Sequence, residues 1–198
     1  METFFTYIQL GFDHIIDIQG YDHILFIISL TILYSIKEWK SLLILVTAFT
    51  LGHSTTLAFT VLDIINFNSD KVEFLIMLSI SITALLNVIR KGKTPDNLEM
   101  KIYYVIAILF GFIHGMGFAS YLKAILGSNG NLFSPLLGFN VGLEIGQLII
   151  VSILLLFTFV INLIFKINKQ SFIMIISSII LGITIPILFE RDIFVLFK

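Results

Sequence analysis

The chain contains no cysteine among its 198 residues, and it is poor in proline, tryptophan and charged side chains. The absence of cysteine excludes disulfides, thiolate metal sites, iron–sulfur clusters and cysteine nucleophiles. Only 13% of the residues are charged, against about 25% in an average globular protein. The 12 basic and 13 acidic side chains cannot form the polar shell that a soluble fold of this length needs. A net charge of −1 gives no basic excess, so we expect no nucleic-acid partner.

What the chain has in abundance is apolar side chains. Hydrophobic residues make up 58% of it, and 20 of them are phenylalanine. This composition also argues against disorder, which requires low hydrophobicity and high net charge. We therefore predict an integral membrane protein whose main partner is the lipid bilayer.

Long apolar stretches between charges and turn residues predict an all-α fold, a single transmembrane domain over residues 1–198. A helix needs about 20 apolar residues to cross the hydrocarbon core. Within 17–190 six stretches qualify as spans: 17–36, 40–63, 71–88, 101–126, 135–165 and 172–189. Residues 1–16 are shorter and amphipathic, typical of a helix that lies at the interface or tucks back into the six-helix bundle.

The distribution of basic residues predicts the orientation. The first, third and fifth connections contain eight of them, namely Lys37, Lys40, Arg90, Lys91, Lys93, Lys101, Lys166 and Lys169. The opposite side has four, namely Lys71, Lys123, Arg191 and Lys198. By the positive-inside rule the first set faces the cytoplasm, with both termini outside.

Polar side chains on four predicted spans reach a similar depth. At 1.5 Å per residue, His53, Ser79, His114 and Glu144 lie about 14–15 Å from the outer ends of their spans, near the bilayer midplane. Glu144 is the only acid at that depth. Burying an ionisable group there costs roughly 3 kcal/mol or more, so we expect it to be paired with a histidine, a cation or a proton.

Further polar residues share helix faces with this group. Thr50 and Ser54 accompany His53, and Asn140 and Gln147 flank Glu144 at i, i+4, i+7 spacing. We expect these four, with Ser79, to orient the ligands rather than to bind a metal. Glycines bracket the same positions and let helices approach closely, which suits internal packing or a contact in a homo-oligomer.

The first span supplies a second polar group, with His14, Asp17, Asp22 and His23 in the string HIIDIQGYDHILF. Counting back from Lys37 places Asp22 and His23 some 8–9 Å inside the outer boundary, at a mouth above the midplane site. Imidazoles mixed with carboxylates suit a divalent ion such as Ni²⁺, Co²⁺, Zn²⁺ or Fe²⁺.

Four strings in separate spans resemble the HupE/UreJ family of bacterial membrane proteins: GFDHIIDIQGYDHILF, FTLGHSTTLA, FGFIHGMGFA and NVGLEIGQL. The resemblance implies a nickel or cobalt permease in the bacterial inner membrane. It also implies that His14, Asp22 and His23 handle the metal. The family's motif has five residues between the histidine and the aspartate, whereas seven separate His14 from Asp22 here.

Taken together, these features predict a secondary permease for a divalent transition metal rather than an enzyme. Asp17, Asp22 and His23, with His14, would capture the ion at the outer face, and His53, His114 and Glu144 would hold it at the midplane. A membrane potential or ion gradient would drive transport, because the sequence contains no nucleotide-binding motif. An intramembrane metal-dependent hydrolase acting on a lipid or lipid-linked substrate is the alternative. A structural subunit without metal is a third.

Overall fold

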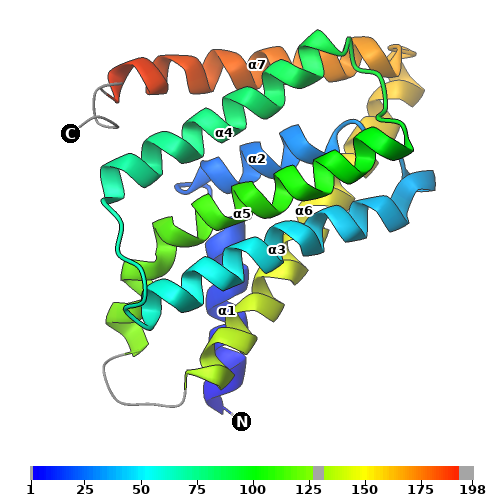
Figure 1. Cartoon of the computed structure of the whole chain (residues 1–198). Coiled ribbons are helices and arrows are strands. Elements are labelled where there is room, and N and C mark those ends of the chain that lie inside the picture. Colours follow the sequence, from blue (N-terminus) through cyan, green and yellow to red (C-terminus); the bar gives the residue numbers. More distant parts are fainter. Residues whose placement is uncertain (1, 127–131, 192–198) are drawn as a thin grey trace.

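The computed structural model describes residues 2–126 and 132–191, and every element in these ranges is helical (Figure 1). Met1 and residues 192–198, which include the predicted outer Lys198, lie outside the described residues. The elements are α1 (Glu2–Ile16), α2 (Tyr21–Thr31), the 3₁₀ turn η1 (Ile36–Glu38), α3 (Trp39–Val61), α4 (Ser69–Ile89), α5 (Asn97–Leu126), α6 (Phe133–Phe165) and α7 (Lys169–Glu190). The predicted all-α class is confirmed.

Five of these helices, α3 to α7, are long and apolar enough to cross a membrane. The sixth predicted span, 17–36, contains α2, an apolar helix of 11 residues. At 1.5 Å per residue it covers about 16 Å, roughly half the hydrocarbon core. Besides α1, the described part of the chain therefore has five long helices and the short α2, and the chain is a multi-pass membrane protein.

A turn at residues 17–20 separates α1 from α2. The Asp17 carboxylate accepts the backbone N–H of Gln19 at 2.9 Å, an interaction that favours a turn over continued helix. Gly20 then precedes the first residue of α2. The turn allows α1 to run in a direction different from that of the other helices (Figure 1).

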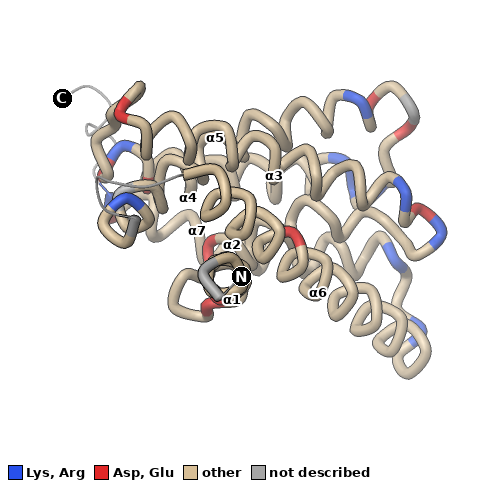
Figure 2. Tube along the Cα trace, turned by 90° about the horizontal axis from the view of Figure 1, so that it is seen from below, with Lys and Arg blue, Asp and Glu red and all other residues tan. Residues whose placement is uncertain are grey.

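The connections at one end of the bundle carry most of the Lys and Arg (Figure 2). η1, the 90–96 link between α4 and α5 and the 166–168 link between α6 and α7 all lie at this end, which we call the basic end. In the 90–96 link, Gly92 has a φ of +65°, a conformation that favours glycine. A Cβ added there would press on the Gln170 backbone.

Two helix pairs pack through glycines. Between α3 and α5, a Cβ added at Gly52 would collide with the Ile108 carbonyl group, and one at Gly111 with that of Phe49. Between α1 and α6, a Cβ added at Gly142 would collide with the Ile8 carbonyl group. Both seams therefore depend on backbone-to-backbone approach, the packing that small residues allow in membranes.

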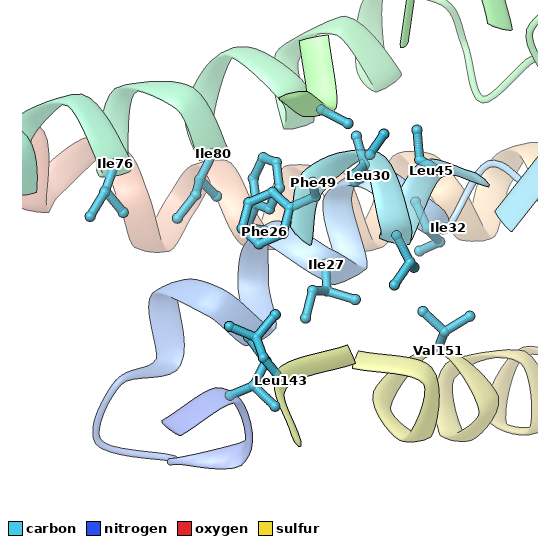
Figure 3. Close-up of a cluster of buried hydrophobic side chains, with 14 of the residues drawn as sticks. Phe26, Ile27, Leu30, Ile32, Leu45, Phe49, Ile76, Ile80, Leu143 and Val151 are labelled. Carbon is cyan, nitrogen blue, oxygen red and sulfur yellow. The ribbon is translucent and has the colours of Figure 1, made fainter. Parts of the chain in front are cut away.

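Buried apolar side chains from α2, α3, α4 and α6 fill the space between these pairs (Figure 3). Phe26 of α2 and Phe49 of α3 are almost completely buried, with ring centroids 4.9 Å apart. Ile80 of α4 and Leu143 of α6 are fully buried in the same cluster. Thus α2, although short, provides a surface on which longer helices meet.

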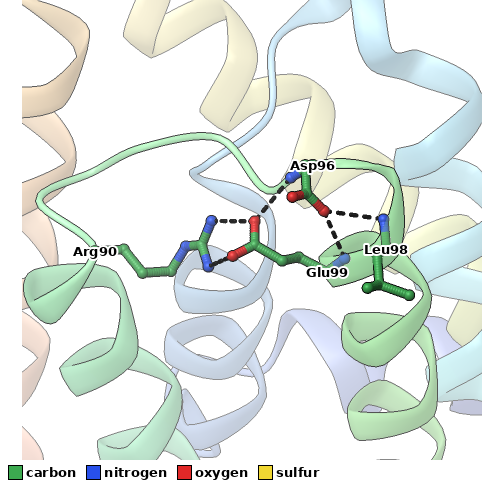
Figure 4. Close-up of polar contacts among 4 residues, drawn as sticks. All are labelled: Arg90, Asp96, Leu98 and Glu99. Atoms are coloured by element: carbon green, nitrogen blue, oxygen red, sulfur yellow. Dashed lines mark hydrogen bonds and ion pairs between the residues drawn. The ribbon is translucent and has the colours of Figure 1, made fainter.

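The link between α4 and α5 is held by an ion pair at the basic end (Figure 4). Arg90 donates two hydrogen bonds, of 2.5 and 2.6 Å, to the two carboxylate oxygens of Glu99, and this bonding raises the pKa of the guanidinium. The Asp96 carboxylate accepts the backbone N–H groups of Leu98 and Glu99, which caps the start of α5. The pair fixes the ends of two spans next to each other.

Candidate metal site

Four imidazoles from four helices meet in the interior of the bundle. We call them the histidine cluster: His14 of α1, His23 of α2, His53 of α3 and His114 of α5. The His14 ring lies 4.5 Å from His23 and 6.0 Å from His53, and His23 lies 5.4 Å from His114, measured between centroids. His14, His23 and His53 each offer one nitrogen, and these three atoms lie within 4.8 Å of one another.

The cluster forms because two local features bring distant residues together. The turn at 17–20 places His14, in the last turn of α1, against His23 near the start of α2. Their rings meet edge to face, so the longer spacing of seven residues before Asp22 still brings His14 into contact with His23. On the other side, the α3–α5 seam places Gly115 against the His53 backbone, one residue after His114.

Five ring nitrogens of the cluster are buried and have no hydrogen-bond partner among the described residues: Nε2 of His14, Nε2 of His23, both nitrogens of His53 and Nε2 of His114. His53 is fully buried, and His114 and His23 are only 1% and 6% exposed. An unsatisfied buried polar group costs about 1–3 kcal/mol. Several of them converging on one point are the arrangement that a metal ion would satisfy.

Hydrogen bonds orient the rings of His23 and His114 and leave the second nitrogen of each ring without a partner in the described chain. His23 Nδ1 lies 2.9 Å from Asp22 Oδ1, and His114 Nδ1 lies 2.8 Å from the Phe110 carbonyl oxygen. Carboxylate and carbonyl oxygens accept hydrogen bonds, so Nδ1 carries the proton in both rings and Nε2 presents its lone pair. This is the arrangement by which outer partners fix histidine ligands of metals.

Aromatic side chains wall the cluster. Phe118 lies 3.8 Å from the His14 ring, Phe139 stacks on His53 at 6.2 Å, and Phe26 and Phe49 lie 4.7 and 5.2 Å from His114, between centroids. An apolar wall lowers the local dielectric, which strengthens charge interactions inside it.

A partly open cavity of about 310 Å³ leads to the cluster. His14, His23 and His114 line its inner part. It is also lined by the 17–20 turn, by the first turns of α4 and by Arg191 after α7. These segments lie at the opposite end of the bundle from the basic end (Figure 1). There Arg191 donates a hydrogen bond to Glu73. His53, the fourth member of the cluster, is not among the residues that line the cavity.

Asp17 and Asp22, predicted to capture the ion, both line the cavity. Asp22 contacts His23, while Asp17 accepts the N–H of Gln19. The structure thus brings the two predicted groups of histidines into one cluster, with the acids on its outer side.

Glu144 lies apart from the imidazoles. Its Oε1 accepts a 2.6 Å hydrogen bond from the Thr47 hydroxyl of α3, and it is not among the residues whose metal-binding atoms gather. One turn away, the Thr50 hydroxyl donates at 2.7 Å to Gln147 Oε1. We call these four residues the α3–α6 polar contact.

The other predicted orienting residues make mostly local bonds. The hydroxyls of Ser54 and Ser79 donate to carbonyl oxygens of their own helices, at Thr50 and Ile76. Asn140 Oδ1 is buried, with no hydrogen-bond partner among the described residues. None of the three hydrogen-bonds to a ring of the cluster among the contacts of the described chain.

Two contributors were not predicted. Thr47, the partner of Glu144, lies three residues before Thr50 and seven before Ser54, so the helical face of those two residues signalled it in the sequence. The Phe110 carbonyl oxygen, which orients His114, carries no side-chain signal because it is a backbone atom.

The fold and the buried imidazoles define a polytopic helical membrane protein with a candidate transition-metal centre. A family model described as HupE / UreJ protein matches residues 1–191, and the chain belongs to that family. Membership implies a membrane protein related to nickel or cobalt transport. Neither the curated proteins nor the solved structures give a significant match to the chain.

Proposed function

We propose that this protein is a secondary permease for a divalent transition-metal ion, with nickel or cobalt as the first candidates and zinc as a third. The observation that carries the proposal is the histidine cluster, with its five buried ring nitrogens lacking partners in the described part of the chain. Neutral imidazoles are intermediate ligands suited to these three ions. The ion would be the cargo of the protein, held by His14, His23 and His53 with His114 adjacent.

The cavity supports transport over intramembrane hydrolysis. Its mouth is formed by residues at helix ends, including Asp17, Glu73 and Arg191, which is the entry expected for a hydrated ion from the aqueous side. Three carboxylates line it, those of Asp17, Asp22 and Glu73, against one arginine. This acidic balance attracts cations.

The orientation we propose places the basic end in the cytoplasm and the cavity mouth outside, with the protein in the inner membrane. The support is the positive-inside rule applied to connections that gather at one end of the bundle. In this orientation the cavity receives the ion from outside, and the membrane potential favours its inward movement.

The test compares variants of His23 in α2 and His53 in α3 with a control variant in α3. His23→Ala and His53→Ala should each weaken Co²⁺ binding to the purified protein, measured by calorimetry, by more than about 100-fold. Loss of an outer partner of a ligand already costs about 10–100-fold. Both should reduce Ni²⁺ and Co²⁺ uptake into proteoliposomes to background. Thr55→Ala, an exposed position of α3 whose hydroxyl bonds to Leu51, should retain both properties.

Wild-type binding and uptake in both histidine variants would contradict the proposal. Tight metal binding without uptake, combined with cleavage of an added lipid-linked ester or amide, would favour the hydrolase instead.

A further inference from the structure

The α3–α6 polar contact is the second place where polar side chains meet inside the bundle. It joins Thr47 to Glu144 and Thr50 to Gln147, with bonds of 2.6 and 2.7 Å. Figure 1 shows α6 running obliquely across α3, so the two helices approach over a short stretch only. Glu144 is the only acidic residue of the 33 in α6. An acid within a transmembrane helix is costly unless it is paired or functional.

The position of this contact along α3 relates it to the histidine cluster. From the end of the bundle that holds the cavity toward the basic end, α3 carries His53, then Thr50, then Thr47 at intervals of three residues. The rise of 1.5 Å per residue places Thr47, and with it the Glu144 carboxylate, about 9 Å nearer the basic end than His53. The cavity is lined by His14, His23 and His114 and by residues at the other end of the bundle, and His53 is not among its lining residues.

The chemistry of the contact differs from that of the cluster. It consists of oxygen atoms: a carboxylate, an amide and two hydroxyls. Asn140, one turn before Glu144 on the same face of α6, has a buried Oδ1 with no hydrogen-bond partner in the described chain. The transition-metal ions proposed as cargo bind such oxygens more weakly than they bind imidazoles. An ion leaving His53 toward the basic end would meet the Glu144 carboxyl group at this contact.

We propose that Glu144 forms a second, inner cation-binding station of oxygen ligands, distinct from the histidine cluster, and that the Thr47–Glu144 and Thr50–Gln147 bonds hold it closed in this structure. The inference rests on the proposed transport function and assigns its inward step. The ion passes from His53 to Glu144 when α3 and α6 part at these two bonds, and the weaker oxygen ligands release it at the basic end.

The experiment separates binding from transport. Glu144→Gln keeps the size of the side chain and can still accept a hydrogen bond from Thr47, but it removes the charge. Co²⁺ binding to the purified variant, followed by the visible absorption of histidine-bound Co²⁺, should remain within about twofold of wild type. Initial Co²⁺ uptake into proteoliposomes should fall at least tenfold, a barrier increase of about 1.4 kcal/mol.

A second variant, Thr47→Val, keeps the charge and removes the closing bond. It should leave Co²⁺ binding unchanged and raise the initial uptake rate about threefold or more, because opening no longer breaks a bond to a charged group. Ser152→Ala, an exposed position of α6 whose hydroxyl bonds only to Leu148 of its own helix, serves as the control for both variants. Size-exclusion profiles establish that each variant is folded.

Uptake at wild-type rates in both variants would overturn the inner station. Loss of Co²⁺ binding in folded Glu144→Gln would also overturn it, because Glu144 would then belong to the histidine site. Failure of the proposed function gives a different result: wild-type protein that neither binds Co²⁺ through histidine nor takes it up.

Discussion

The histidine cluster and the α3–α6 polar contact share helix α3, yet they satisfy their polar atoms in opposite ways. In the cluster, both nitrogens of fully buried His53 lack partners in the described chain. In the contact, two or fewer turns away along α3, Thr47 and Thr50 each donate to an oxygen of α6. Buried polar groups are normally paired. We therefore propose the unpaired region, and not the hydrogen-bonded one, as the place where a ligand binds in this structure.

The largest effect should come from a change that breaks both regions together. Gly52→Ala places a Cβ against the Ile108 carbonyl group, and backbone atoms cannot move aside. Since α3 carries both regions, the variant should lose about 3 kcal/mol or more of stability, the upper range for overpacking. The measurement is the yield of monodisperse protein and its apparent melting temperature in detergent.

Gly182→Ala is the matched control for this prediction. No atom lies within 4 Å of a Cβ added at Gly182 of α7, so the same substitution should be neutral or slightly stabilising. Equal behaviour of the two variants would show that the α3–α5 seam does not need its glycine.

An intermediate effect should follow from disturbing the cluster alone. Asp22→Ala removes the carboxylate that orients His23 through Nδ1. Loss of such an outer partner should lower Co²⁺ affinity about 10–100-fold, while the melting temperature of the metal-free protein changes little. Calorimetric titration measures this, and unaltered affinity would mean that Asp22 has no part in orienting the ring. Asp13→Ala, an exposed acid of α1 that accepts a hydrogen bond from Gln9, provides the comparison.

The smallest of these effects should come from disturbing the contact alone. Thr50→Val preserves the shape of the side chain but leaves buried Gln147 without its hydroxyl donor. The expected loss is about 1–3 kcal/mol of stability, with Co²⁺ affinity within twofold of wild type. Thr55→Val is the control, because its hydroxyl bonds only within α3 on an exposed face. A Thr50→Val variant that loses metal binding would merge the two regions into one site.

The sequence predicted the long helices well because their signal is local. The stretch 40–63 became α3 (Trp39–Val61), and 135–165 became α6 (Phe133–Phe165), since uninterrupted apolar runs leave no other structure in lipid. The stretch 17–36 contains only α2 (Tyr21–Thr31). Its apolar count was sufficient, but the turn held by the Asp17 carboxylate occupies its first residues.

Which residues meet in the candidate site depends on how each helix is rotated and tilted, as well as on the depth of each residue in the membrane. Depth along the helices placed His53, His114 and Glu144 at a similar level, but it could not determine the direction in which each side chain points. The structure turns Glu144 toward Thr47, whereas His53 and His14 meet at 6.0 Å. The approach of His14 follows from the packing of α1 on α6, which the hydropathy of neither helix reveals.

The glycine seam between α1 and α6 has a consequence for biosynthesis. Gly11 and Gly142, which face each other's helices, are about 130 residues apart in the chain. His14 emerges from the ribosome long before the helix against which α1 packs. The complete set of imidazoles therefore cannot assemble on a nascent chain until α6 has been inserted. A truncated product ending before α6 would lack the surface on which α1 packs, and would leave the histidine cluster without the support that α6 gives to His14.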